Sequence, residues 1–152
     1  MNEGQTILLV EDCENDLWLM RHAFQQAGSH HRLREVRDGE EAIAYLKGEG
    51  PYSDREKFPW PIVVLMDLNL PKKNGYDVLT WVRAQPHLKR LAIFILTAST
   101  RSEDVECAFY LGATAYLAKP RNLETLEAMI RCLCAWIEFN HFPSIPEAVR
   151  PV

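Results

Sequence analysis

The chain has 152 residues, of which 47% are hydrophobic and 25% are charged, a composition typical of one folded domain. Its net charge of −4 argues against binding to nucleic acid or to a membrane surface through a diffuse basic patch. The chain begins with neither a basic segment nor a long apolar one, and its apolar runs, such as 62–66 and 91–96, are far too short to span a bilayer. We therefore expect a cytoplasmic protein, with its four cysteines as reduced thiols.

Five short apolar segments alternate along the chain with segments of helical period. The expected strands are 6–10, 32–36, 62–66, 91–96 and 114–118. The near-continuous apolar runs at 62–66 and 91–96 are typical of strands covered on both faces, whereas 32–36 alternates like an edge strand. Strict alternation of strands and helices predicts an α/β fold, with a parallel sheet and helices on both of its faces.

Apolar residues at helical spacing mark the expected helices, and glycines mark where some of them end. We expect the first helix to end at Gly28, the second at Gly48 and the fourth, which begins near Ser102, at Gly112. The apolar stripes of the other expected helices consist of Leu17, Met20, Phe24 and Ala27, of Ala42, Ile43 and Leu46, of Tyr76, Leu79 and Val82, and of Leu126, Met129, Ile130, Leu133, Trp136 and Ile137.

Two segments depart from this alternation of strands and helices. Residues 48–61 are long for a connection in a compact α/β domain, so we expect this insert to be functional or mobile. The tail, 140–152, contains three prolines and is not expected to continue the last helix far. We therefore expect one domain over 1–152, with a core at about 5–139 and no output domain.

Residues with functional side chains follow four of the five expected strands. Glu11 and Asp12 follow the first strand, Asp67 the third, Thr97 the fourth and Lys119 the fifth. Because the carboxyl ends of parallel strands meet at one edge of the sheet, we expect these side chains to converge there.

The expected cluster combines chemical groups that suit phosphoryl transfer. Carboxylates packed together repel unless a cation compensates, and their hard oxygen atoms suit Mg²⁺. Lys119 would supply a further positive charge, and an aspartate can act as the nucleophile that accepts a phosphoryl group. The sequence therefore predicts a phosphoryl-transfer site with Mg²⁺ at this edge.

Four sequence segments, in order and at the strand ends, resemble those of the receiver domains of two-component response regulators. They are ILLVED (7–12), VVLMDLNLPKKNG (63–75), ILTAS (95–99) and GATAYLAKP (112–120). The resemblance covers about residues 5 to 139. It implies a flavodoxin-like fold, in which a five-stranded parallel sheet has the order 2-1-3-4-5.

The resemblance also assigns roles around the expected metal ion. It implies that Asp67 is the phosphoacceptor and that Asp12 and Asp67 bind Mg²⁺ directly. Glu11 would act through a water molecule and Asn69 through its backbone carbonyl. Asn69 and Ser99 occupy positions that tune the rate of phosphate hydrolysis in this family.

Further residues match the parts of a receiver that respond to phosphorylation. Thr97 resembles the switch hydroxyl that moves to the phosphoryl group, and Lys119 resembles the lysine that bridges to it. Tyr116 resembles the switch aromatic residue that turns inward as Thr97 moves. Pro120 stands where the family has a cis peptide bond.

The sequence further resembles stand-alone receivers that are paired with bacterial phytochrome-type kinases. The features are the segment NLPKKNGYDVL (69–79), the 48–61 insert and a long last helix. The implied partner is a sensor histidine kinase. Family receivers often dimerise through the fourth helix, fifth strand and fifth helix. We expect a homodimer through this surface, because four large apolar residues near the end of the long last helix exceed what one helix face usually buries: Trp136, Ile137, Phe139 and Phe142.

We interpret the chain as a phospho-receiver that signals through partner binding or onward phosphotransfer, and its residues argue against three other functions. A phosphatase with an aspartate nucleophile usually has a second aspartate two residues later, where this chain has Asn69, so we expect no turnover of external substrates. A phosphate-independent adaptor would not need all these groups. A nucleotide-binding protein would need a glycine-rich loop after the first strand, where Glu11 and Asp12 stand instead.

Overall fold

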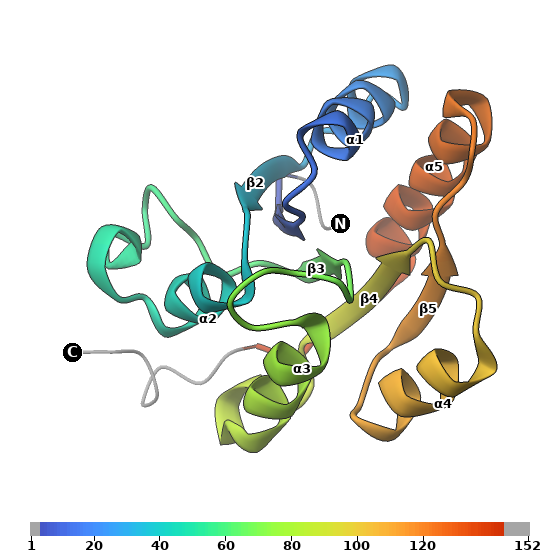
Figure 1. Ribbon diagram of the computed structural model, residues 1–152. Helices are drawn as coiled ribbons and strands as arrows, with labels where there is room; N and C mark the ends of the chain where they lie inside the picture. The colour runs from blue at the N-terminus through green and yellow to red at the C-terminus, as the bar shows by residue number, and fades with distance from the viewer. Residues whose placement is uncertain (1–3, 145–152) are drawn as a thin grey trace.

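The computed structural model describes residues 4–144 and contains five strands, five α-helices and two short 3₁₀ helices in that part of the chain (Figure 1). The strands are β1 (Thr6–Val10), β2 (Arg32–Val36), β3 (Val63–Met66), β4 (Ala92–Thr97) and β5 (Ala115–Ala118). The helices are α1 (Glu14–Gln26), α2 (Gly39–Lys47), α3 (Gly75–Ala84), α4 (Ser102–Tyr110) and α5 (Leu123–Phe139), with 3₁₀ turns at Gly50–Tyr52 and Pro86–Leu88.

All neighbouring strands pair in parallel, and their order across the sheet is β2-β1-β3-β4-β5. This confirms the predicted fold class. β1 and β2 have the expected bounds, whereas β3, β4 and β5 each begin one residue later than expected. β2 lies at one edge of the sheet, as its alternating sequence predicted, and β5 lies at the other.

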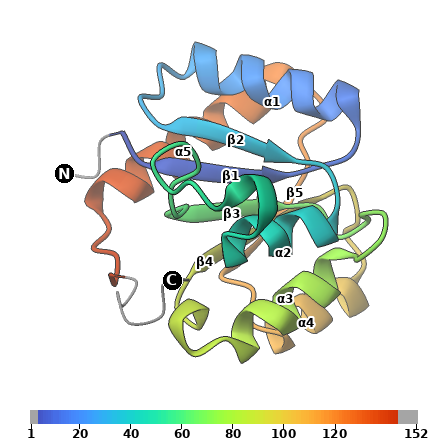
Figure 2. The ribbon, with the colours of Figure 1, turned by 90° about the vertical axis from the view of Figure 1, so that its left-hand side faces the viewer.

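Helices cover both faces of the sheet, with α1 and α5 on one side and α2, α3 and α4 on the other (Figure 2). The strand residues alternate between two separate apolar clusters because successive side chains point to opposite faces. Ile7 and Leu9 belong to the cluster beneath α1 and α5, and Leu8 and Val10 belong to the one beneath α2 and α3. All four are almost fully buried. The sheet is therefore the middle layer of three.

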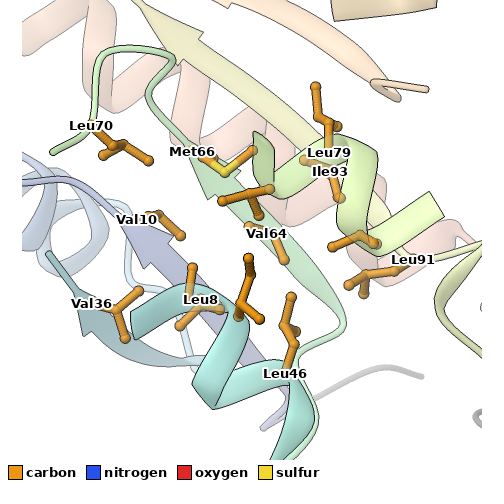
Figure 3. Packing of buried hydrophobic residues seen from close by; sticks show 14 of the residues in the cluster. Leu8, Val10, Val36, Leu46, Val64, Met66, Leu70, Leu79, Leu91 and Ile93 are labelled. Atoms are coloured by element: carbon orange, nitrogen blue, oxygen red, sulfur yellow. The ribbon is translucent and has the colours of Figure 1, made fainter. Parts of the chain in front are cut away.

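Figure 3 shows the second cluster, in which strand side chains meet those of α2 and α3. Leu46 of α2 and Leu79 of α3 reach down to the sheet, where Val64 and Ile93 project from the central strands. The exposure of each of these side chains is at most 1%. Burial of an aliphatic side chain contributes about 1.5–3 kcal/mol, so this layer fixes α2 and α3 against the sheet.

The ends of the helices follow the signals in the sequence. Asn74 caps α3 in a reciprocal pair with Asp77, in which each side chain accepts a hydrogen bond from the other residue's backbone N–H. Gly28, Gly48 and Gly112 follow their helices with positive φ angles of 68°, 72° and 102°. Glycine adopts this left-handed backbone without a steric penalty, so the predicted ends of these helices are confirmed.

The insert 48–61 packs against α2. Tyr45 of α2 donates a hydrogen bond to the carbonyl of Pro59 at 2.8 Å, and its ring lies 5.0 Å from that of Tyr52. The Arg55 guanidinium stacks on Trp60 at 3.9 Å and donates to the carbonyl of Leu46 at 3.1 Å. These contacts join the insert to the body of the domain at the β2 edge.

Among the described helices, none combines the length and the apolar character that crossing a bilayer requires.

Candidate functional site

Lys119 gathers three carboxylates at the carboxyl ends of the strands. Its Nζ lies 2.8 Å from Oε1 of Glu11, 2.8 Å from Oδ2 of Asp16 and 2.8 Å from Oδ2 of Asp67. Glu11 follows β1, Asp67 follows β3 and Lys119 follows β5, so the parallel sheet brings together residues that are far apart in sequence. We call these four residues the Lys119 cluster. The predicted convergence of Glu11, Asp67 and Lys119 is present.

Burial and charge shift the acid strengths within the Lys119 cluster. Glu11 is 2% exposed, and this burial, together with the neighbouring Asp16 carboxylate, raises the pKa of Glu11 to about 8 although Lys119 opposes the shift. The pKa of Asp16 is lowered, first by its contact with Glu11 and then by Lys119. Burial lowers the pKa of Lys119, but its hydrogen bonds to the three carboxylates outweigh that effect and raise it overall. The ammonium group therefore stays charged.

The residues expected to hold Mg²⁺ differ in how they are placed. Oδ1 of Asp67 accepts a long hydrogen bond, 3.3 Å, from the backbone N–H of Asn69. Asp12 is exposed and forms no hydrogen bond or ion pair with any residue in 4–144. Its carboxylate therefore stays available, and Oε2 of Glu11 is buried without a hydrogen-bond partner among the described residues.

This donor set fits a hard divalent cation. Asp12, Asp67 and Glu11 supply carboxylate oxygen atoms, and Mg²⁺ binds such oxygens while keeping several of its waters. Asn69 is exposed beside Asp67, as a ligand through its carbonyl would require. The residues present would thus hold Mg²⁺ or a similar ion.

Asp16 belongs to the site although the sequence did not single it out. It lies in the first turn of α1, where an acidic side chain is common because it favours the positive end of the helix. Its side chain instead reaches Lys119, and its ligand atoms lie within 4.8 Å of those of Glu11 and Cys13. The signal available in the sequence was its position in the first turn of the helix that directly follows Glu11 and Asp12.

Thr97 and Tyr116 lie beside the Lys119 cluster and are linked through Ser99. Thr97 ends β4 and is 0% exposed, and its Oγ1 faces the backbone N–H of Ser99 at 3.5 Å. Tyr116 of β5 is half-buried, and its hydroxyl donates to the carbonyl of Ser99 at 2.9 Å. Tyr116 therefore already lies inward against the β4–α4 loop.

No peptide bond in the described part of the chain is cis. The bond between Lys119 and Pro120, where the resemblance implied a cis peptide, is therefore trans.

The four apolar residues near the chain's end are not equally accessible. Ile137 is 0% exposed and belongs to the core, so it cannot contribute to a surface as expected. Trp136 packs between Phe94 and Phe142, with ring centroids 5.1 Å and 5.4 Å away. Phe139 is 80% exposed and is the largest apolar surface of this group.

Comparison with known proteins agrees with this fold and site. The model of the response regulator receiver domain family matches residues 7–131. The response regulator Rcp1 of Synechocystis sp. is 38% identical over 144 residues, which cover 94% of this chain and 96% of that protein.

Two solved structures show the same relationship. The phosphorylated cyanobacterial phytochrome response regulator RcpA is 34% identical, with a TM-score of 0.84 over 93% of this chain and 99% of that one. The Mn²⁺-bound form of Rcp1 is 38% identical, with a TM-score of 0.80 over 92% of this chain and 99% of that one. The family model, these relatives and the sheet order agree: the chain belongs to the response regulator receiver domain family, which acts in two-component signalling and not on external substrates.

Proposed function

We propose that this chain is a phospho-receiver that accepts a phosphoryl group on Asp67 from a sensor histidine kinase, with Mg²⁺ bound beside it. The observation that supports this most directly is the Lys119 cluster, in which Asp67 is paired with the lysine at the carboxyl end of β3. A half-buried lysine in contact with three carboxyl groups is poised to exchange one of them for a phosphoryl oxygen.

In the proposed transfer, a carboxylate oxygen of Asp67 attacks the phosphorus atom of the kinase's phosphohistidine. The P–N bond breaks, its electron pair leaves with the imidazole, and an acyl phosphate forms on Asp67. A divalent ion, when bound by Asp12, Asp67 and Asn69, supplies positive charge to the phosphoryl oxygens. Lys119 then neutralises another of these oxygens, because its ammonium already lies 2.8 Å from Asp67.

Phosphorylation replaces the single negative charge of the Asp67 carboxylate with the charge of about −2 of an acyl phosphate at the end of β3. Thr97 carries the one side-chain hydroxyl of β4, and we propose that it turns to a phosphoryl oxygen and gives up its contact with Ser99. Tyr116 senses this change, because it bonds to the same residue. Output would then pass through a partner protein or onward phosphotransfer from a single receiver domain.

The relatives support a particular class of partner. RcpA is described as a phytochrome response regulator, and a further similar structure is a bacteriophytochrome response regulator, 34% identical to this chain. We propose a phytochrome-type sensor kinase as the phosphoryl donor, in the cytoplasm, and a homodimer through α4, β5 and α5. The exposed aromatic residues Phe109 and Tyr110 of α4 and Phe139 of α5 support this surface.

Intact-protein mass spectrometry after incubation with acetyl phosphate and Mg²⁺ tests the proposal. We expect one phosphoryl adduct on the wild type, none without Mg²⁺ and none on Asp67→Asn. Asp54→Asn is the matched control, because Asp54 is an exposed aspartate in the insert, away from the Lys119 cluster, and this variant keeps the adduct. A wild type that gains no adduct and binds no beryllofluoride would contradict the proposal and favour a phosphate-independent adaptor.

A further inference from the structure

Asp104 joins three elements next to the proposed switch residues. Its Oδ1 accepts a hydrogen bond from the hydroxyl of Tyr76 at 2.6 Å, and its Oδ2 accepts one from the hydroxyl of Ser99 at 2.5 Å. Tyr76 lies in the first turn of α3, Ser99 in the β4–α4 loop and Asp104 in the first turn of α4. We call these three residues the Asp104 network.

The Asp104 network joins an ionised carboxylate, that of Asp104, to a partly buried tyrosine, Tyr76. Tyr76 packs against the apolar cluster beneath α2 and α3, and this burial, followed by the bond to Asp104, raises the pKa of the Tyr76 hydroxyl. The bonds from Ser99 and Tyr76 lower the pKa of Asp104. Hydrogen bonds to an ionised acceptor are about twice as strong as neutral ones. Ser99 is therefore held from one side by a carboxylate that is itself fixed to α3.

The backbone of Ser99 is what the proposed switch residues contact. Tyr116 donates to its carbonyl at 2.9 Å, and its N–H faces Oγ1 of Thr97 at 3.5 Å. The side chain of Ser99 is bound to Asp104, so Ser99 links Asp104 to both Thr97 and Tyr116. A change in the position of Ser99 would move the acceptor of Tyr116.

We infer that Tyr76 and Asp104 are positioning residues, which hold Ser99 and thereby keep Tyr116 inward before any phosphoryl group arrives. The consequence of this inference rests on the proposed function: when a phosphoryl group reaches Asp67, the β4–α4 loop is already in its final position. Preorganisation of this kind raises affinity because less ordering is needed on binding. Loss of the network lowers the inward population of Tyr116 and weakens binding of a phosphoryl analogue.

The first measurement needs no phosphoryl chemistry. Fluorine NMR of 3-fluorotyrosine-labelled protein reports on the five tyrosines, and the Tyr116 signal is the one lost in Tyr116→Phe. We expect Tyr76→Phe and Asp104→Ala to shift this signal, and Tyr110→Phe to leave it in place. Tyr110 is the matched control because it lies in α4 and is 89% exposed. An unmoved Tyr116 signal in both variants would overturn the inference, whatever the chain's function.

The second measurement is the affinity for beryllofluoride with Mg²⁺ present. We expect Tyr76→Phe and Asp104→Ala to weaken it roughly three- to tenfold, the size that the loss of a bond to a charged group allows. Mg²⁺ affinity alone should not change, since the metal ligands lie at other strand ends. In a Tyr116→Phe background the further substitution Tyr76→Phe should have no added effect, whereas a merely structural role would give additive losses.

The outcomes separate this inference from the proposed function. If the wild type binds no beryllofluoride but Tyr76→Phe shifts the Tyr116 signal, the proposed function fails and the positioning role stands. If the wild type binds beryllofluoride and both variants bind it as tightly as the wild type does, the positioning role fails and the proposed function stands.

Discussion

Lys119 illustrates how a single side chain can balance an acidic site. Three carboxyl groups surround its ammonium, so the cluster carries one compensating charge within the protein itself. A metal ion that binds Asp12 and Asp67 competes with Lys119 for the oxygen atoms of Asp67. The lysine and the ion therefore divide the carboxylates between them, and metal binding changes which partner each oxygen has.

The raised pKa of Glu11 predicts how stability depends on pH in the metal-free protein. Its pKa is about 8 in the folded protein against an ordinary value of 4.5, so its favourable contribution is complete below pH 4.5 and lost as the pH rises through 8. Glu11→Gln cannot ionise. We expect the unfolding free energy of the variant to rise relative to that of the wild type between these limits, by several kcal/mol, since one pKa unit corresponds to about 1.4 kcal/mol.

Urea unfolding in a chelating buffer, at several pH values, measures this difference. Glu40→Gln is the control, because Glu40 is an exposed acid in the first turn of α2 and its substitution should show no such trend. A difference between Glu11→Gln and wild type that stays constant over the whole range would contradict the prediction.

The sequence predicted which residues lie at the strand ends, but it did not predict which contacts the helix residues make. Glu11, Asp67 and Lys119 were predictable because their positions follow from where each strand ends. Asp16 and Asp104 lie in helices, so their contacts depend on how each helix is turned against the sheet. The partners of Asp104 are five and 28 residues away, and no local spacing links them. The roles of Asp67, Thr97 and Tyr116 stay predictions.

At the scale of elements, Gly75 shows how closely α3 approaches the end of β3. A Cβ atom added at Gly75 would lie 2.7 Å from the carbonyl oxygen of Asp67 and 2.9 Å from Cα of Leu68. Both atoms belong to backbone and cannot turn away. The first residue of α3 is therefore glycine because the helix begins directly against the proposed phosphoacceptor.

Gly75→Ala is expected to reduce both stability and function. Overpacking against backbone costs about 1–3 kcal/mol, which chemical denaturation would detect. The displaced Asp67 should also gain less phosphoryl adduct from acetyl phosphate than the wild type gains. Thr80→Ala, an exposed substitution in the same helix, is the control and should leave both measurements near wild type. Wild-type stability in Gly75→Ala would show that the loop yields without cost.

Element ends were predictable wherever a local signal set them. The glycines after α1, α2 and α4 have the positive φ angles that their positions suggested. The insert was not predictable in the same way, because its packing depends on Tyr45 and Leu46 of α2. Its sequence alone indicated only that 48–61 was long, whereas the structure shows aromatic and cation–π contacts that hold it.

At the scale of the whole molecule, the exposed aromatic residues lead us to predict a homodimer. Phe139 is 80% exposed on α5, and burial of such a ring in a dimer is worth about 1.5–3 kcal/mol. We expect sedimentation at micromolar concentration to show a dimer, and Phe139→Ser to raise its dissociation constant about tenfold or more. Trp18→Ser, which removes an aromatic residue 56% exposed on α1, should leave the dimer intact.

Measurement with and without beryllofluoride would show whether phosphorylation strengthens this association. A wild type that sediments as a monomer under both conditions would contradict the proposed dimer, and equal effects of the two substitutions would place the interface elsewhere.

The parallel sheet also determines where an experimenter can attach something to this molecule. All five strands point the same way, so the Lys119 cluster lies at one end of the sheet. A cavity of about 290 Å³ at the other end is lined by Gln5, by Leu91 and by Phe142, Pro143 and Ser144. The described chain therefore enters and leaves the fold beside the starts of the strands. A fluorophore or a surface tether joined near Gln5 or Ser144 would leave the acidic end facing solution, free to meet a kinase.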